Sequence, residues 1–188
     1  MTDFPERKRM RLSGFDYNEC YRVFLTICVK DRRCLLARIV GTGVPDGPHC
    51  VPQSEARVEL KRAGKIADEV IRKMNSFYEY VSVDEYVIMP NHIHFLLSFY
   101  PEGDSCSEDG PSGTPVPTGN AKQNSRLSKF LSSFKRFCNK EYGENLWQYR
   151  SYDHVIRDQD DLVKHINYIW ENPAKWHLDQ LYSESSPL

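Results

Sequence analysis

Two short β-favouring runs separated by Pro90-Asn91 restrict the fold of this chain more than any other feature. Residues 87–89 and 93–97 are apolar and contain valine, isoleucine and phenylalanine, which favour extended backbone. Proline and asparagine between such runs are typical of a turn. The stretch 87–99 therefore predicts either two strands joined by a tight turn or one strand broken by a kink.

His92 and His94 stand two residues apart in the second of these runs. Because successive side chains on a strand point to opposite faces, both imidazoles share one face and Ile93 points to the other. Two neutral imidazoles on a rigid strand make two-thirds of a common kind of metal site. A pair of ordinary histidines is the alternative. A His-x-His motif alone favours ordinary histidines. The other motifs of the chain favour the metal site instead.

Length and composition suit one domain spanning residues 1–188, since 40% of its 188 residues are hydrophobic and this is enough for one core. Residues 41–56 are rich in glycine and proline, and residues 101–121 in glycine, serine and proline. Neither segment shows the periodicity of a helix or strand, so we expect two flexible loops.

Several classes of protein are excluded or disfavoured. No run approaches the ~20 apolar residues of a membrane helix. Residues 1–11 are charged rather than apolar, so we expect no secretory signal. The six cysteines form no Cys-x-x-Cys pair, which argues against a zinc knuckle and predicts reduced thiols in a cytoplasmic protein. A net charge of −1 means that any nucleic-acid surface must be local.

Periodicity predicts the other elements. Residues 21–29 carry apolar side chains on both faces and predict a central strand that is covered on both sides. Residues 80–89 predict the strand that leads into the histidines. Helices are predicted at 61–78, 125–142 and 158–171.

The last predicted helix carries a polar stripe beside its apolar one. Leu162, Ile166 and Ile169 form the apolar stripe, whereas His165, Tyr168 and Asn172 follow each other at spacings of three and four. A half-buried tyrosine with polar neighbours is one interpretation. Beside the two histidines a second interpretation arises: an oxygen of Asn172 is the third ligand of a divalent cation, and the phenol attacks a phosphate held there.

The chemistry of such a site is coherent. A phenol has a pKa near ~10 and needs a base or a cation before it becomes a useful nucleophile. A Mg²⁺ or Mn²⁺ ion would polarise the scissile phosphate. Attack by the tyrosine would leave a phosphotyrosine and free a 3′ hydroxyl, so that the strand can be rejoined without a nucleotide cofactor.

Clustered and single cations supply candidate contacts to DNA phosphates. The motif 7-RKRMR-11 is either an arm that lies along phosphates or a solvated tail. The arginines of the 146–157 stretch either meet phosphates or pair with acids. The candidate DNA-binding residues are Arg7, Lys8, Arg9, Arg11, Arg150 and Arg157.

These motifs together resemble the HUH single-tyrosine transposases, and within them the REP-associated tyrosine transposases. The resemblance covers roughly residues 7–178. It rests on 11-RLSGFDY-17, 21-YRVFLTICVKDR-32, 92-HIH-94 after Met89-Pro90-Asn91, 147-WQ-148, 153-DHVIR-157 and 168-YIWENP-173.

The resemblance implies an α+β, ferredoxin-like (RRM-like) antiparallel sheet with helices on one face and a C-terminal helix that carries the tyrosine. It implies metal-dependent nicking and joining of single-stranded DNA through a 5′-phosphotyrosine, often beside a hairpin. His92 and His94 would be metal ligands, Tyr168 the nucleophile and Asn172 a group beside the metal. His165 would orient the tyrosine or aid the metal. Such enzymes act as monomers or as homodimers, and both states remain open.

Two other functions remain open from the sequence. One is a module that binds single-stranded nucleic acid by stacking and has lost catalysis. The other is a metal-dependent nuclease that uses bound water, with Tyr168 only structural.

Overall fold

The computed structural model describes residues 21–41, 56–100 and 126–183. Its main element is a four-stranded antiparallel sheet in the order β4-β5-β1-β6, and a separate two-stranded sheet joins β2 to β3. The strands are β1 (Tyr21–Val29), β2 (Ala37–Val40), β3 (Arg57–Leu60), β4 (Val81–Ile88), β5 (His92–Phe99) and β6 (Trp147–Val155). The α-helices are α1 (Arg62–Phe77), α2 (Arg126–Tyr142) and α3 (Gln159–Glu171).

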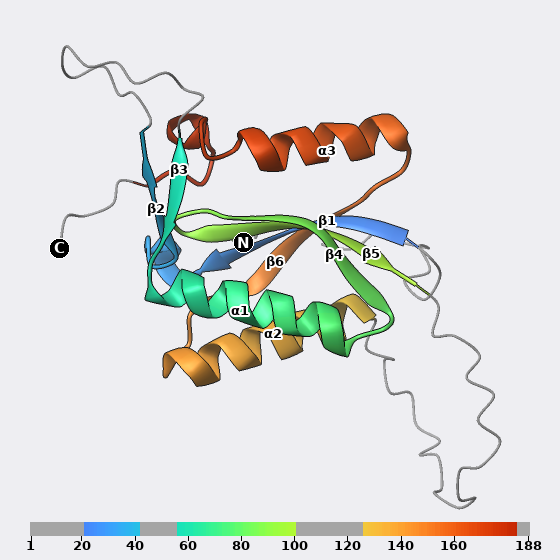
Figure 1. Ribbon diagram of the computed structural model, residues 1–188, viewed down its shortest axis with the longest axis horizontal. Helices are drawn as coiled ribbons and strands as arrows, with labels where there is room; N and C mark the ends of the chain where they lie inside the picture. The colour runs from blue at the N-terminus through green and yellow to red at the C-terminus, as the bar shows by residue number, and fades with distance from the viewer. Residues whose placement is uncertain (1–20, 42–55, 101–125, 184–188) are drawn as a thin grey trace, which may run out of the picture.

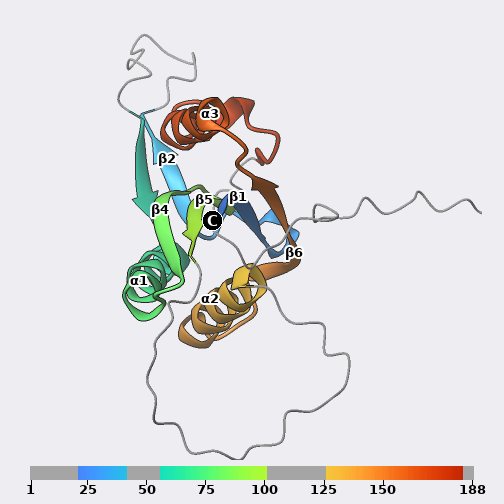
Figure 2. The ribbon, with the colours of Figure 1, turned by 90° about the vertical axis from the view of Figure 1, so that its right-hand side faces the viewer.

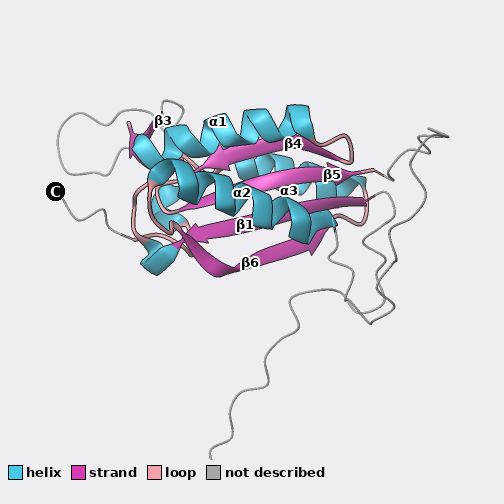
Figure 3. Ribbon diagram, turned by 90° about the horizontal axis from the view of Figure 1, so that it is seen from below, coloured by secondary structure: helices cyan, strands magenta, loops and turns pink. Residues whose placement is uncertain are grey.

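The helices cover the two faces of the sheet unequally. Figure 1 shows α1 and α2 side by side below the sheet and α3 alone above it. The same layers appear end-on in Figure 2, and Figure 3 shows α1 and α2 across the sheet with α3 behind it. One face therefore carries two helices and the other carries one, which leaves part of the second face free for a site.

The face under α1 and α2 holds the larger core. Phe95 packs against Phe130 and Phe134, with ring centroids 6.1 and 5.5 Å apart, and all three side chains are fully buried. Burial of a side chain of this size contributes about 1.5–3 kcal/mol. The core on the α3 face is smaller and rests on Phe24, Leu96 and Ile169.

The strand predicted at 21–29 is confirmed, with both neighbours in place. β1 pairs with β5 on one side and β6 on the other, and its side chains are buried on both faces apart from Arg22 near its start and the half-buried Cys28. The tight-turn alternative for residues 87–99 is also confirmed. Ile88 lies opposite Ile93, and the Met89 amide donates to the His92 carbonyl at 2.9 Å.

The three predicted helices are confirmed to within a residue or two of their ends. Asp158 caps α3, since its side chain accepts a hydrogen bond from the Asp161 amide at 2.8 Å, as a good N-cap does. Among the described residues no helix has the length and apolar character needed to cross a membrane. The interiors of both predicted loops and the whole 7–11 arm lie outside the described residues, and so does the side chain of Phe77.

The sequence did not reveal β6 or the β2–β3 hairpin. Only Trp147 and Val155, at the two ends of β6, are buried. Tyr149 and Tyr152 between them are exposed, so the strand lacks the apolar alternation that predicts strands. Backbone pairing with β1 holds it at the edge of the sheet.

The first turn of α1 depends on the absence of a side chain at Gly64. A Cβ atom there would overlap the Leu36 carbonyl oxygen, which already accepts the Lys61 amide at 2.8 Å. Gly64→Ala would gain about 1 kcal/mol of helix propensity but would force backbone apart, so we expect a net loss of about 1–2 kcal/mol in the free energy of unfolding. Urea titration measures it. The control is Lys65→Ala at the exposed neighbouring position, which should change the free energy of unfolding by less than about 0.5 kcal/mol. Equal stability of the two variants would contradict the close packing of Gly64 on Leu36.

Candidate active site

The two histidines of β5 lie under α3 and face each other. Both side chains are buried, with 0% of His92 and 3% of His94 exposed, whereas Ile93 points into the opposite core. The two Nε2 atoms are 2.9 Å apart. Two ligands at right angles around an ion with bonds of about 2.1 Å would be separated by ~3.0 Å, so this spacing suits adjacent ligands of one small cation.

Hydrogen bonds at the far side of each ring fix the orientation of the pair. His92 Nδ1 lies 2.8 Å from the Asn91 side-chain oxygen, and His94 Nδ1 lies 2.8 Å from the Thr26 hydroxyl. Such partners on the outer ring nitrogen are typical of histidines that bind metal through the other nitrogen.

The Asn91 amide also determines where His92 carries its proton. Its nitrogen donates to the Leu181 carbonyl at 2.8 Å, which turns its oxygen toward His92. Because that oxygen can only accept, His92 Nδ1 must donate and its Nε2 must carry a lone pair. The Thr26 hydroxyl can donate or accept, so His94 can present a proton or a lone pair to its partner.

Burial keeps both imidazoles neutral. Desolvation, helped by the positive charge of Arg32, lowers the pKa of His92 to about 3. Desolvation and the neighbouring His92 also lower the pKa of His94 well below its ordinary value. Neutral imidazole is the form that binds metal ions, so the pair is in its ligand form at neutral pH.

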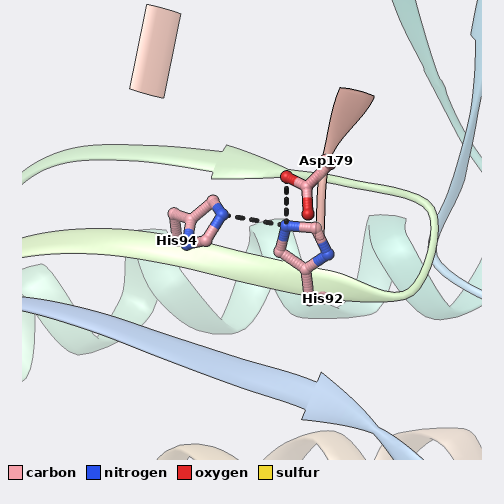
Figure 4. A group of neighbouring side chains, drawn as sticks. All are labelled: His92, His94 and Asp179. Carbon is pink, nitrogen blue, oxygen red and sulfur yellow. Dashed lines mark hydrogen bonds and ion pairs between the residues drawn. The ribbon is translucent and has the colours of Figure 1, made fainter. Parts of the chain in front are cut away.

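A carboxylate from the C-terminal segment completes a group of three possible ligands. Asp179 follows the short 3-10 helix Trp176–Leu178, and its Oδ2 lies 3.9 Å from His92 Nε2. Figure 4 shows the carboxylate reaching the two rings from a different part of the chain. Its other oxygen accepts the Leu181 amide at 2.6 Å, and the Trp176 ring packs on His92 at 5.8 Å.

Asp179 was not among the site residues predicted from the sequence. The residue is the first acid after the last helix, within 176-WHLDQL-181, where three large apolar residues favour a chain that folds back onto the protein. An acid inside such an apolar segment was the available signal. Only the fold shows that the segment returns to β5.

Tyr168 lies beside the histidines in the same chain. Its ring centroid is 5.2 Å from that of His94, and its hydroxyl donates to Asp179 Oδ2 at 3.4 Å. The side chain is 43% exposed, so a ligand can reach it. Partial burial and the negative charge of Asp179 raise the pKa of Tyr168, and the neighbouring Asn172 side chain acts in the opposite direction.

Asn172 and His165 occupy different surroundings on α3. Asn172 is buried with 4% exposed, and within the described part of the chain its side-chain oxygen has no hydrogen-bond partner. His165 packs on Phe24 at 4.7 Å and stacks on His154 at 4.8 Å. Asp161 bridges these two histidines, with Oδ2 2.8 Å from His154 Nε2 and Oδ1 3.2 Å from His165 Nδ1. This second polar group ties α3 to β6.

A cavity of about 1000 Å³ opens beside His94, His165 and Tyr168. Its lining includes His94, Tyr168 and Asp179 at one end and Arg150 on β6. Arg157, the other candidate cation of this stretch, lines a separate hollow near Arg22 and the start of α3. The structure therefore brings Arg150 to the site and places Arg157 away from it.

Comparisons with known proteins point in one direction. No protein-family model matches the chain. A Haemophilus influenzae protein of no stated function is 26% identical over 181 residues, which cover 94% of this chain and 93% of that protein. A second Haemophilus influenzae protein, provisionally named a REP-associated tyrosine transposase, is 32% identical over 88 residues, 47% of each chain. An Escherichia coli REP-associated tyrosine transposase is 28% identical over 93 residues, 50% of this chain and 44% of that one.

A solved structure of a REP-associated tyrosine transposase bound to a REP hairpin has a TM-score of 0.51 at 17% identity, and covers 98% of this chain and 95% of that one. The chain is similar to the REP-associated tyrosine transposases. The fold is shared along nearly the whole chain, whereas the sequence match spans about half of each relative that carries the name.

The histidine pair of this transposase-like chain predicts a pH-dependent stability. Unfolded imidazoles bind a proton near pH ~6.5, whereas folded His92 does so only at about pH 3. Between these values the unfolded state binds more protons, so the free energy of unfolding falls as pH is lowered through this window. Thermal unfolding in chelator at pH 7.5, 6.5 and 5.5 measures the effect.

The double variant His92→Asn/His94→Asn should show a shallower decline in Tm than the parent. His177→Asn, at an exposed histidine, is the matched control and should keep the parent's decline. An equal decline in all three proteins would mean that the buried pair does not titrate as described.

Proposed function

We propose that this chain is a metal-dependent HUH tyrosine transposase, a site-specific single-strand endonuclease and strand transferase. It cleaves and rejoins single-stranded DNA at hairpin-associated sites through a 5′-phosphotyrosine. The observation that carries the proposal is the convergence of His92, His94 and Tyr168. The two Nε2 atoms are 2.9 Å apart, the phenol ring is 5.2 Å from His94, and His94 and Tyr168 line one cavity.

The proposed fold is the ferredoxin-like (RRM-like) one, in a single domain over residues 1–188. The chain order β1-α1-β4-β5-α2-β6 with sheet order β4-β5-β1-β6 supports it, since this is the β-α-β-β-α-β arrangement. Tyr168 on α3 is then held by a helix added on the opposite face. We expect the protein to act in the cytoplasm. Its partner would be single-stranded or hairpin DNA, and the monomer and homodimer are both compatible with a site that one chain completes.

His92 and His94 would hold a Mg²⁺ or Mn²⁺ ion, with oxygen from Asn172 or Asp179. The donor set fits such an ion, since it joins two oriented neutral imidazoles to a buried carboxylate and a buried amide oxygen that lacks a partner among the described residues. When bound, the cation would polarise the scissile phosphate and offset the negative charge of Asp179 that raises the pKa of Tyr168.

Tyr168 would attack the phosphorus, so that an O–P bond forms to the phenol while the bond to the 3′ oxygen breaks. Asp179 accepts the phenol's hydrogen bond and is therefore the group placed to receive its proton. Asn172 lowers the pKa of the phenol and so favours its ionised form. His165 would position Tyr168 rather than react, since it contacts Phe24, whose ring lies 5.8 Å from that of the tyrosine.

Arg150 would bind DNA next to the site, as its place in the cavity supports. Arg157 would contact DNA near the start of α3. Arg7, Lys8, Arg9 and Arg11, which lie outside the described residues, stay proposed phosphate contacts on the strength of the sequence.

A trapped covalent complex tests the nucleophile. Hairpin oligonucleotides with randomised single-stranded flanks, labelled at the 3′ end and incubated with Mn²⁺, should yield a protein–DNA adduct that survives denaturing electrophoresis. Tyr168→Phe should abolish the adduct, a loss of at least 10³-fold, because it removes the attacking oxygen. Tyr149→Phe, at a tyrosine 98% exposed on β6, is the matched control and should react normally.

Cleavage without an adduct in both the parent and Tyr168→Phe would favour the water-using nuclease. DNA binding with neither cleavage nor adduct would favour the binding module. Either result would contradict the tyrosine mechanism.

Asp179→Asn separates the two roles of this carboxylate. The change keeps the shape but removes the negative charge, so we expect Mn²⁺ affinity to fall about tenfold or more. Without metal, the pKa of Tyr168 should move down toward its ordinary value because Asp179 raises it. Isothermal titration with Mn²⁺ and ultraviolet titration of the phenols measure these effects. Glu171→Gln, at an exposed carboxylate paired with Lys175, is the control, and unchanged values in Asp179→Asn would remove Asp179 from the site.

A further inference from the structure

The face of β6 that looks toward α3 presents an exposed aromatic ring, and β1 separates this strand from the histidines of β5. Tyr152 lies opposite Thr26 on β1, and Thr26 holds His94 by a 2.8 Å hydrogen bond. Directly opposed residues in an antiparallel sheet have Cβ atoms about 4.5–5.5 Å apart. Tyr152 nevertheless remains 63% exposed, and the small core under α3 includes no residue of β6.

Tyr152 lines the same cavity as Tyr168, His94 and Asp179. The volume of about 1000 Å³ is at the upper end of the range of about 300–1,000 Å³ that encloses drug-sized ligands. The floor is made by β1 and β6, one wall by α3 and the other by the segment that follows Asp179. A ligand that reached Tyr168 could therefore extend along the sheet to Tyr152 without leaving the cavity.

Two unpaired cations border this extension. Arg150 on β6 and Lys164 on α3 both line the cavity, and among the described residues neither has a carboxylate partner. Of the two acids that line the same cavity, Glu171 pairs with Lys175, and Asp179 keeps its negative charge beside the neutral His92. Arg150 and Lys164 therefore offer two positive charges that suit a phosphate.

We propose that Tyr152 and Arg150 form a nucleotide subsite beside the catalytic group, where a base of single-stranded DNA stacks on the tyrosine while its phosphate lies on the arginine. An exposed aromatic ring next to a cation is the usual platform for a single-stranded base, and it accepts any base because each has a flat face. This subsite rests on the proposed function. It would hold the single-stranded DNA next to the scissile phosphate.

The neighbouring tyrosine provides a matched control. Tyr149 lies on the same strand, three residues away, where the register between β6 and β1 shifts. It lines a hollow beside α2, with Leu131 and Lys135, and not the cavity of the catalytic group. Both tyrosine side chains are exposed, so replacing either one with alanine removes an aromatic ring from the protein surface.

Fluorescence anisotropy without metal tests the subsite in the full chain. One probe is a fluorescein-labelled hairpin DNA with mixed-sequence single-stranded flanks, and the second is the same hairpin without flanks. Tyr152→Ala should weaken binding of the flanked probe about tenfold, and Tyr152→Phe should retain it because the ring is kept. Tyr149→Ala should bind like the parent. Arg150→Gln should reduce the slope of log K against log salt by about 1.

Binding of the flankless hairpin should be the same in the parent and Tyr152→Ala, and thermal melts should show that each variant folds. If the parent binds the flanked probe and Tyr152→Ala binds it equally well, the subsite is wrong while the proposed function stands. An equal loss with both probes, or with Tyr149→Ala, would also overturn the subsite. If the parent binds neither probe, the proposed function fails and the subsite with it.

Discussion

The site depends on two hydrogen bonds made on the far side of two buried rings. Asn91 and Thr26 bond the Nδ1 atoms of His92 and His94, and so turn both Nε2 atoms toward one point. Burial of a polar ring costs free energy unless the ring is hydrogen-bonded. These two partners therefore stabilise the orientation in which the imidazoles face each other. Asn91 comes from the hairpin turn and Thr26 from the adjacent strand. The sheet itself therefore orients the pair.

The unequal covering of the sheet explains how a polar site survives inside a small protein. Among the described residues, the face under α1 and α2 holds most of the buried aromatic and aliphatic side chains. The α3 face keeps only a small core around Phe24, Leu96 and Ile169, and next to it the histidines, Tyr168 and Asn172 are collected. The main core thus lies on the face of the sheet opposite the site.

Periodicity predicted β1, β4, β5 and the three α-helices, and with them the side chains that share a face. His92 and His94 share a face because a strand alternates, and Tyr168 joins Asn172 on one stripe because a helix repeats every 3.6 residues. These are local rules, and they hold for β1, β5 and α3 in the structure. The rules fail at β6, whose residues alternate poorly because it is an edge strand with an exposed middle.

Asp179 could not have been predicted in the same way. It stands 85 residues after His94 in the sequence, and it reaches the site only because Trp176 packs on His92 and Asn91 binds the Leu181 carbonyl. Long-range contacts of this kind follow from packing and not from any local repeat. The same holds for Tyr152, whose place beside the cavity depends on its register opposite Thr26.

The most direct measurement is an anomalous difference map of crystals grown with Mn²⁺. The account predicts one peak per chain within coordination distance of both His92 Nε2 and His94 Nε2, with oxygen from Asn172 or Asp179 nearby. A peak held instead by His154, Asp161 and His165, the other group of possible ligands, would contradict it. So would well-ordered crystals in which Mn²⁺ leaves the two imidazoles hydrogen-bonded to each other.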